Sequence, residues 1–99
     1  MSAEKTFEPR YTVGQTVIPD VTSQSIAIGY ASETICLSNF GTEVAFVRVG
    51  LPGITATTAD YPVMPASQVT ISKGLDDSTV AFISPSGPGS LHIIPGVGY

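Results

Sequence analysis

Charged residues are scarce in this chain of 99 residues. Twelve of them are Asp, Glu, Lys or Arg, which is 12% of the chain, whereas globular chains carry about 25%. Eight acidic residues outnumber four basic ones and leave a net charge of −4. A chain with this balance has no basic surface to attract nucleic acid or an anionic membrane, and we expect it to bind neither.

Cysteine and tryptophan are rare or missing. The single cysteine, Cys36, excludes a disulfide framework and any site built from several thiolates. There is no tryptophan, and the four tyrosines are scattered, which argues against a carbohydrate-binding module. No apolar run approaches the roughly 20 residues of a membrane span, and residues 1–10 lack the apolar segment of a signal peptide. The sequence therefore predicts synthesis in the cytoplasm.

What the chain does contain is enough apolar material for one folded domain. Hydrophobic residues make up 42% of it, and the mean hydropathy is +0.29, which is too high for a disordered protein. Its length suits a single domain. Residues 1–10 alternate polar and charged side chains, so we expect an extended N-terminal arm there and one domain over residues 11–99.

Short β-rich segments fill that domain. Ten glycines and eight prolines interrupt the chain and leave no window with the 3.6-residue apolar period of a helix. The segments between them are rich in Val, Ile, Thr and aromatic residues, which favour strands. Seven strands are predicted, at 11–18, 25–28, 34–38, 44–49, 67–72, 79–84 and 90–94, with a shorter eighth piece at 55–58. Their number and spacing predict an all-β fold, an antiparallel β-sandwich or jelly-roll-like barrel of seven to eight short strands.

The connections suggest how these strands pair. Asn39-Phe40-Gly41 has the residues of a tight hairpin turn. Residues 73–77 and 85–89 are short connections, so the last three strands are expected to form a meander. The long, proline-rich stretch 50–65 is expected to cross from one sheet to the other.

Several predicted strands are apolar on both faces. In residues 44–49, 80–83 and 91–94, apolar side chains occupy nearly every position, whereas a strand with one solvated face alternates apolar and polar residues. Such strands are central in a small barrel, or are covered by loops of the same chain or by another chain. Together with the low charge, the pattern favours burial against other subunits.

Few residues offer chemistry. His92 is the only histidine and lies between Leu91 and Ile93 in a predicted strand, which favours a packed or surface residue over a base or ligand. Cys36 has no nearby cation to activate it. Asp76-Asp77 is interpreted as a solvated turn, and Asp60 as a residue that makes a local turn bond. No metal or cofactor site is predicted, and we do not expect an enzyme.

Arg48 is the charged residue that stands out, because it follows Val44 and Phe46 on one face of an apolar strand. Its guanidinium either pairs with Glu33, Glu43 or an acid of a neighbouring subunit, or lies at a strand end and reaches water. The residues expected at an interface between subunits are Phe7, Arg10, Phe46 and Arg48.

Three stretches resemble a known group of proteins. They are the segment from Cys36 to Gly50, with its Asn39-Phe40-Gly41-Thr42 turn; the segment from Ala56 to Pro65, with Ala59-Asp60-Tyr61-Pro62-Val63; and the segment from Val80 to Gly98, ending in Pro95-Gly96-Val97-Gly98. Together they cover about the last two-thirds of the chain. This pattern is similar to that of small, largely uncharacterised β-rich proteins from the structural-gene regions of tailed bacteriophages and prophages.

The resemblance implies a component of the virion, present in several copies and without catalytic residues. It does not fix the place in the virion. The apolar, charge-poor composition suits many weak contacts, so we expect a capsid cement or decoration subunit, a homotrimer that contacts a major capsid protein and whose arm lies across a neighbour. The alternative is a tail, neck or fibre component that mediates assembly or host attachment.

Overall fold

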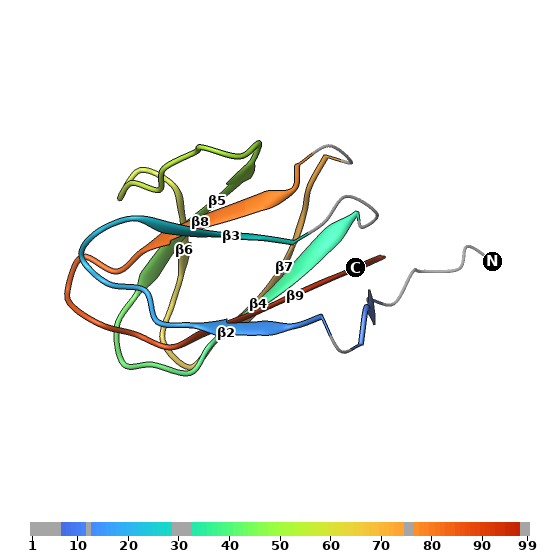
Figure 1. Cartoon of the computed structure of the whole chain (residues 1–99). Helices are drawn as coiled ribbons and strands as arrows, with labels where there is room; N and C mark the ends of the chain where they lie inside the picture. The colour runs from blue at the N-terminus through green and yellow to red at the C-terminus, as the bar shows by residue number, and fades with distance from the viewer. Residues whose placement is uncertain (1–6, 12, 29–32, 75–76, 98–99) are drawn as a thin grey trace.

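The computed structural model describes residues 7–11, 13–28, 33–74 and 77–97. Within them the chain forms nine strands and no helix, arranged as two antiparallel sheets packed face to face (Figure 1). The predicted all-β sandwich is confirmed, with nine short strands where seven to eight were expected.

The first sheet, sheet A, has the order β1-β9-β4-β7, and β2 pairs with β9 beside β1. β1 and β2 pair with successive parts of β9, so they form one interrupted edge. The strands of sheet A are β1 (Glu8–Pro9), β2 (Gln15–Val17), β4 (Thr34–Asn39), β7 (Gln68–Ser72) and β9 (Leu91–Val97).

The second sheet, sheet B, has the order β3-β8-β5-β6. Its strands are β3 (Gln24–Ala27), β5 (Ala45–Gly50), β6 (Tyr61–Val63) and β8 (Thr79–Ile83). All seven predicted strands overlap observed ones. The predicted piece at 55–58 is wrong: those residues lie in a loop, and the extra strand forms at β6.

The chain passes from one sheet to the other at nearly every connection. β4 belongs to sheet A and β5 to sheet B, so the turn at Asn39-Phe40-Gly41 is not the predicted hairpin. The predicted meander is also wrong, because β7 and β9 both pair with β4 while β8 lies in sheet B. A loop of about five residues spans the ~10 Å between stacked sheets as readily as it joins neighbouring strands. Loop length therefore did not distinguish a hairpin within one sheet from a crossing between the sheets.

The stretch 50–65 behaves in the opposite way from the prediction. β5 and β6 are antiparallel neighbours in the same sheet, and the crossing comes after β6, at residues 64–67. Residues 51–60 leave the end of β5 and extend over the outer face of sheet B, which Figure 1 shows as the yellow-green loop beside β5 and β8. The backbone N–H of Ala56, itself 4% exposed, donates to Oγ of Ser23, the residue before β3 (2.8 Å).

This loop explains why β8 is buried on both faces. Val80 and Phe82 face the core, while Ala81 and Thr79 face outward and yet are 0% and 6% exposed. We expected subunit contacts to bury such two-faced strands. Over β8 this chain's own loop extends across the outward side, so that expectation is wrong for this strand.

The core lies between the sheets and is built from the inward residues of the central strands. Its buried members are Ile35, Leu37, Ala45, Val47, Val63, Val80, Phe82, Leu91 and Ile93. They alternate along each strand with residues on the outer faces, as the period of two requires. Burying each of the larger side chains contributes about 1.5–3 kcal/mol.

Four connections meet at one end of the sandwich, which we call the loop end: residues 18–23, 40–44, 64–67 and 84–90. Asn39, 2% exposed, ties two of them together. Its amide nitrogen donates to the carbonyls of Glu43 (2.9 Å) and Val63 (2.8 Å), and its Oδ1 accepts from the N–H of Gly41 (2.9 Å). These bonds satisfy the buried amide and hold loop 40–44 against the end of β6, where loop 64–67 begins.

The described part of the expected arm lies along its own chain. Glu8 and Pro9 pair with Val97 and Gly96 of β9, and the N–H of Arg10 donates to the carbonyl of Pro95 (2.9 Å). Residues 1–6 lie outside the described residues, so an arm across a neighbour stays a prediction for them.

Candidate functional site

The outer face of sheet A has an unusual composition, and the strand register defines it. Side chains on this face form three rows across the sheet: Ser72, Thr34 and Gly96; Thr70, Cys36 and Ile94; and Gln68, Ser38, His92 and Thr16. We call these residues the sheet A face. None of them is Asp, Glu, Lys or Arg, and β2, β4, β7 and β9 contain no such residue at any position.

Hydrogen bonds between neighbouring strands order this face. Thr16 Oγ1 lies 2.9 Å from Nδ1 of His92, and Nε2 of Gln68 donates to Oγ of Ser38 at 2.8 Å. Cys36 is buried between Thr70 and Ile94, as expected for a small packed residue. The exposed side chains on this face are Thr16, Gln68, Thr70 and Ser72.

Small residues let other segments approach this face closely. A Cβ on Gly14 would lie 2.7 Å from Nε2 of His92, so the chain before β2 passes directly over the imidazole. A Cβ on Gly96 would overlap the carbonyl oxygen of Glu8 and come within 2.7 Å of the Phe7 ring. Glycine is therefore required at position 96 for the present packing, because the obstacle there is backbone, whereas at position 14 a turn of the His92 side chain would relieve the contact.

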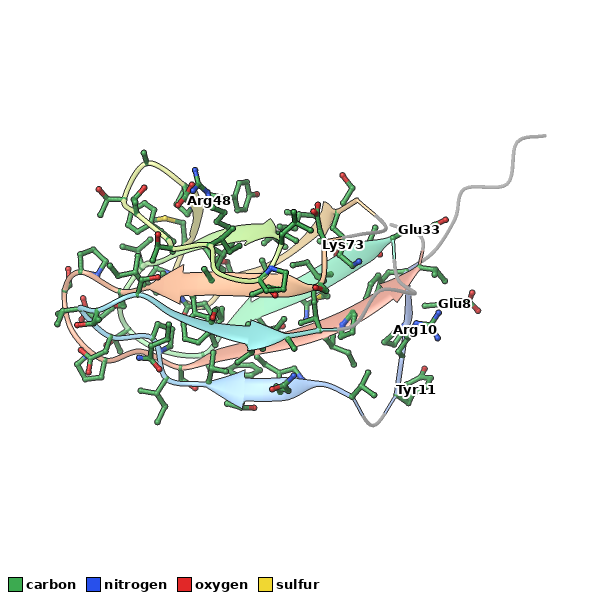
Figure 2. The ribbon with its side chains drawn as sticks, turned by 45° about the horizontal axis from the view of Figure 1, so that its top comes forward. Glu8, Arg10, Tyr11, Glu33, Arg48 and Lys73 are labelled. Atoms are coloured by element: carbon green, nitrogen blue, oxygen red, sulfur yellow. The ribbon has the colours of Figure 1, made fainter. Side chains whose placement is uncertain are left out.

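The charged side chains gather elsewhere. Figure 2 shows Glu8, Arg10, Glu33 and Lys73 toward the end of the sandwich opposite the loop end, with Tyr11 beside them, and Arg48 on sheet B. The molecule thus has a charged end and an uncharged face.

The loop end presents apolar side chains to solvent. Ile18, Val21, Phe40 and Met64 are 56–70% exposed, and they come from three of its four loops. Exposed apolar residues are ordinary when they occur singly, but here four of them share one rigid end. Beside Phe40 lies an open depression of about 410 Å³, lined by Ser38, Asn39, Phe40, Ala66, Ser67 and Gln68.

The structure divides the four predicted interface residues between the two sheets. Phe7 is half-buried against Gly96, and Arg10 is exposed where β1 ends on β9. Phe46 and Arg48 lie on the outer face of sheet B, opposite Ile83 and Ala81 of β8. The prediction therefore did not find the residues of the sheet A face.

Arg48 has an acidic partner that was not among those predicted. Its Nε lies 3.1 Å from Oδ1 of Asp60, in the loop that crosses sheet B, and about half of the arginine side chain is exposed. Oδ2 of the same aspartate accepts from the N–H of Thr57 at 2.7 Å, so the predicted local turn bond is confirmed. The predicted partners Glu33 and Glu43 are wrong, because Arg48, on β5, pairs with Asp60 of loop 51–60.

The predicted acidic turn is described in part. Oδ2 of Asp77 accepts from the N–H of Gly74 (3.0 Å), and the N–H of Asp77 donates back to the Gly74 carbonyl (3.1 Å), as in a closed turn. Asp76 lies outside the described residues.

The space between the sheets is filled with apolar side chains. In the described part of the chain, no three His, Cys, Asp or Glu residues lie close enough together to hold a metal ion.

A second open depression, of about 400 Å³, lies between β3 and loop 51–60 and is lined by Ser25, Ile26, Ala27, Pro52, Gly53, Ser78 and Thr79. No helix in the described ranges is long and apolar enough to cross a membrane.

Comparison with known proteins gives a likeness in fold. No family model matches the chain, and no curated protein matches it. Among solved structures, PirA superposes with a TM-score of 0.59 at 9% identity, over 87% of this chain and 95% of PirA. The Cupin_2 domain of an XRE family transcriptional regulator from Enterobacter cloacae gives 0.50 at 12% identity, over 93% of this chain and 95% of that domain.

Hydroxypropylphosphonic acid epoxidase from S. wedmorenis, in complex with fosfomycin, gives a TM-score of 0.52 at 10% identity. The match covers 83% of this chain and 42% of the epoxidase, so this chain corresponds to under half of that enzyme. At such identities the comparisons show the fold alone, an antiparallel β-sandwich.

Proposed function

We propose that this chain is a non-enzymatic structural subunit of a bacteriophage virion, a capsid decoration protein that acts through protein–protein contacts. The observation that carries the proposal is the sheet A face, whose four strands contain no charged residue. This face presents hydroxyl and amide groups and no charge. Its burial against another protein has a small desolvation cost, because no ion has to leave water.

Two further features support a contact role. The interior is filled by apolar side chains, so the chemical groups available to a ligand lie on the surface. The net charge of −4 keeps the protein away from packaged nucleic acid. The last two-thirds of the chain resemble phage structural-gene products, and this resemblance is the reason for proposing a virion protein.

The decisive measurement is the copy number in purified particles, obtained by quantitative mass spectrometry against the major capsid protein. A decoration subunit is expected in a ratio comparable to that of the capsid protein. Particles that contain none of this chain would refute the proposal.

A matched pair of variants then tests the face. Particles made without the protein are mixed with purified chain carrying Thr16→Lys, which places a charge on the exposed edge of the sheet A face, or Thr58→Lys, which places it on exposed loop 51–60. We expect Thr16→Lys to lower binding about tenfold or more, since an unpaired charge must be desolvated. Thr58→Lys should bind like the unmodified protein. Equal binding by both variants would exclude the sheet A face.

A second candidate function is attachment, as a tail, neck or fibre component. The exposed apolar side chains of the loop end favour it, since a rigid apolar end suits docking to another protein. In this case a small, fixed copy number is expected. Phe40→Ser, on the loop end, should then reduce adsorption of particles to host cells. Leu51→Ser, at another exposed apolar residue on loop 51–60, should not.

A further inference from the structure

The edge formed by β7 differs from the other edges of the two sheets. An open strand edge can pair with another chain, and proteins block this with proline, charge, short strands or cover. Pro9 interrupts β1, Pro62 interrupts β6, and β2 has only three residues. On β3, the carbonyl of Ala27 accepts a bond from Nε2 of Gln15 (3.0 Å). β7 has five residues, without a proline or a charge.

The hydrogen bonds to β4 show which backbone groups of β7 face outward. Asn39 N–H donates to the Ser67 carbonyl (2.9 Å), and Lys73 N–H donates to the Glu33 carbonyl (2.8 Å). Bonded pairs alternate along an antiparallel ladder, so residues 67, 69, 71 and 73 bond to β4. The N–H and C=O groups of Gln68, Thr70 and Ser72 therefore point away from it. In the described part of the chain, β7 pairs with no strand other than β4.

We propose that β7 pairs antiparallel with β7 of a second copy of this chain, about a two-fold axis at Thr70. In this register Thr70 faces Thr70 of the partner subunit, and Gln68 faces Ser72 of the partner subunit. These are the three positions whose backbone groups point outward on each copy. The pairing forms six backbone hydrogen bonds and joins the two A sheets into one.

The side chains of β7 suit this register because their pattern is the same in both directions. Gln-Val-Thr-Ile-Ser alternates polar and apolar residues around its central threonine. Half-buried Val69 would pack against Ile71 of the partner subunit on the core side, and such apolar cross-strand pairs stabilise a sheet. No like charges oppose each other, and the Gln68 side chain folds back to Ser38, away from the edge.

A strand from a different protein could use the same backbone groups, but its sequence would not have to match this pattern. The two-fold contact predicts a dimer in place of the trimer expected for a decoration subunit. It also gives the sheet A faces of two copies a common, continuous, uncharged surface. The pairing does not depend on a virion role, so its failure would leave the proposed function standing, and the reverse is equally true.

The two-fold axis gives the proposal a specific test, because residue 70 then faces its own copy. Sedimentation equilibrium of the purified full chain should give twice the 10.3 kDa chain mass at high concentration. Thr70→Lys alone and Thr70→Glu alone should each weaken the dimer about tenfold or more, since like charges oppose each other. An equimolar mixture of the two should restore a dimer containing one of each. The same pair of substitutions at Ser25, on the β3 edge, should leave the mass unchanged.

Thr70→Pro tests the backbone contribution. It removes an N–H that points away from β4, so the fold is expected to survive, as circular dichroism would show, while two of the six bonds between copies are lost. Ser25→Pro, at a matched position on β3, is the control. A monomer at millimolar chain concentration would overturn the proposal. So would a trimer, or a dimer unaffected by any change at residue 70. A dimer that forms only in the lysine–glutamate mixture would also overturn it, since the unmodified chain would then have no such contact.

Discussion

The outer faces of the two sheets are each buried at one central strand, β8 in sheet B and β4 in sheet A, but by different means. Over sheet B, residues 51–60 of the same chain cross the outward side of β8, and Ala81 is fully buried. On sheet A, small residues of β4 such as Cys36 are enclosed by the side chains of β7 and β9 beside them. In the first arrangement the chain covers its own face, whereas the second leaves an uncharged face open to another molecule.

The largest expected effect comes from placing the same charge on each face. Ala81→Lys would bury an ammonium group under loop 51–60 and opposite Arg48, whose acidic partner Asp60 is already paired. We expect it to lower the free energy of unfolding by about 3–5 kcal/mol, as an unpaired buried charge does. Cys36→Lys, at the equivalent place on sheet A, should cost less, about 1–3 kcal/mol for the larger side chain, because its ammonium group can extend into water. Urea denaturation of both variants measures the difference. Equal losses would mean that the two faces are covered alike.

The close approach at Gly96 offers a second test, on the edge of sheet A. Gly96→Ala introduces a methyl group where the Glu8 carbonyl and the Phe7 ring now lie. Such overpacking costs about 1–3 kcal/mol, and here it should detach residues 7–10 from β9. In the absence of denaturant, hydrogen exchange at the Arg10 amide should accelerate, while exchange in β8 should stay slow. Unchanged protection of Arg10 would contradict the packing of β1 on β9.

A third prediction concerns the bond that ties loop 51–60 to sheet B. Ser23→Ala removes the acceptor of the Ala56 N–H and leaves a buried donor unsatisfied, at a cost of about 1–3 kcal/mol. Proteolysis within residues 51–60 should become faster. Ser25→Ala, two residues along and exposed, is the control and should change neither stability nor cleavage. If both variants behave alike, the loop is held by other contacts.

The positions of the strands and turns along the chain were largely predictable from the sequence, because strands and turns depend on neighbouring residues. The prediction at 34–38 lies within β4, and the one at 79–84 covers β8. The assignment of strands to sheets was not predictable, since β4 pairs with residues that follow it by 30 positions or more. A turn such as Asn39-Phe40-Gly41 looks the same whether it closes a hairpin or crosses between sheets.

The candidate site was likewise predictable only in part. That charge is scarce was evident from composition, and alternating Thr34, Cys36 and Ser38 already mark one face of a strand as small and polar. That this face continues through Thr70 and Ile94 depends on the register of β4 with β7 and β9. Arg48 was noticed for its apolar surroundings, yet its partner Asp60 lies across a loop whose path the sequence did not reveal.

The smallest expected effect tests whether the charge pair on sheet B matters to the cover that loop 51–60 provides. Arg48 is about half exposed, and exposed pairs contribute about 0.2–1 kcal/mol. Arg48→Gln should therefore reduce stability by less than 1 kcal/mol, and added salt should narrow the gap to the unmodified protein, because screening weakens the pair in the latter. Asp60→Asn should cost more, since that carboxylate also accepts from the Thr57 N–H within the loop. Chemical denaturation at low and high salt measures both. A loss at Arg48 as large as that at Ser23 would contradict this, because the ion pair would then hold the loop over β8 as strongly as the Ser23 hydroxyl does.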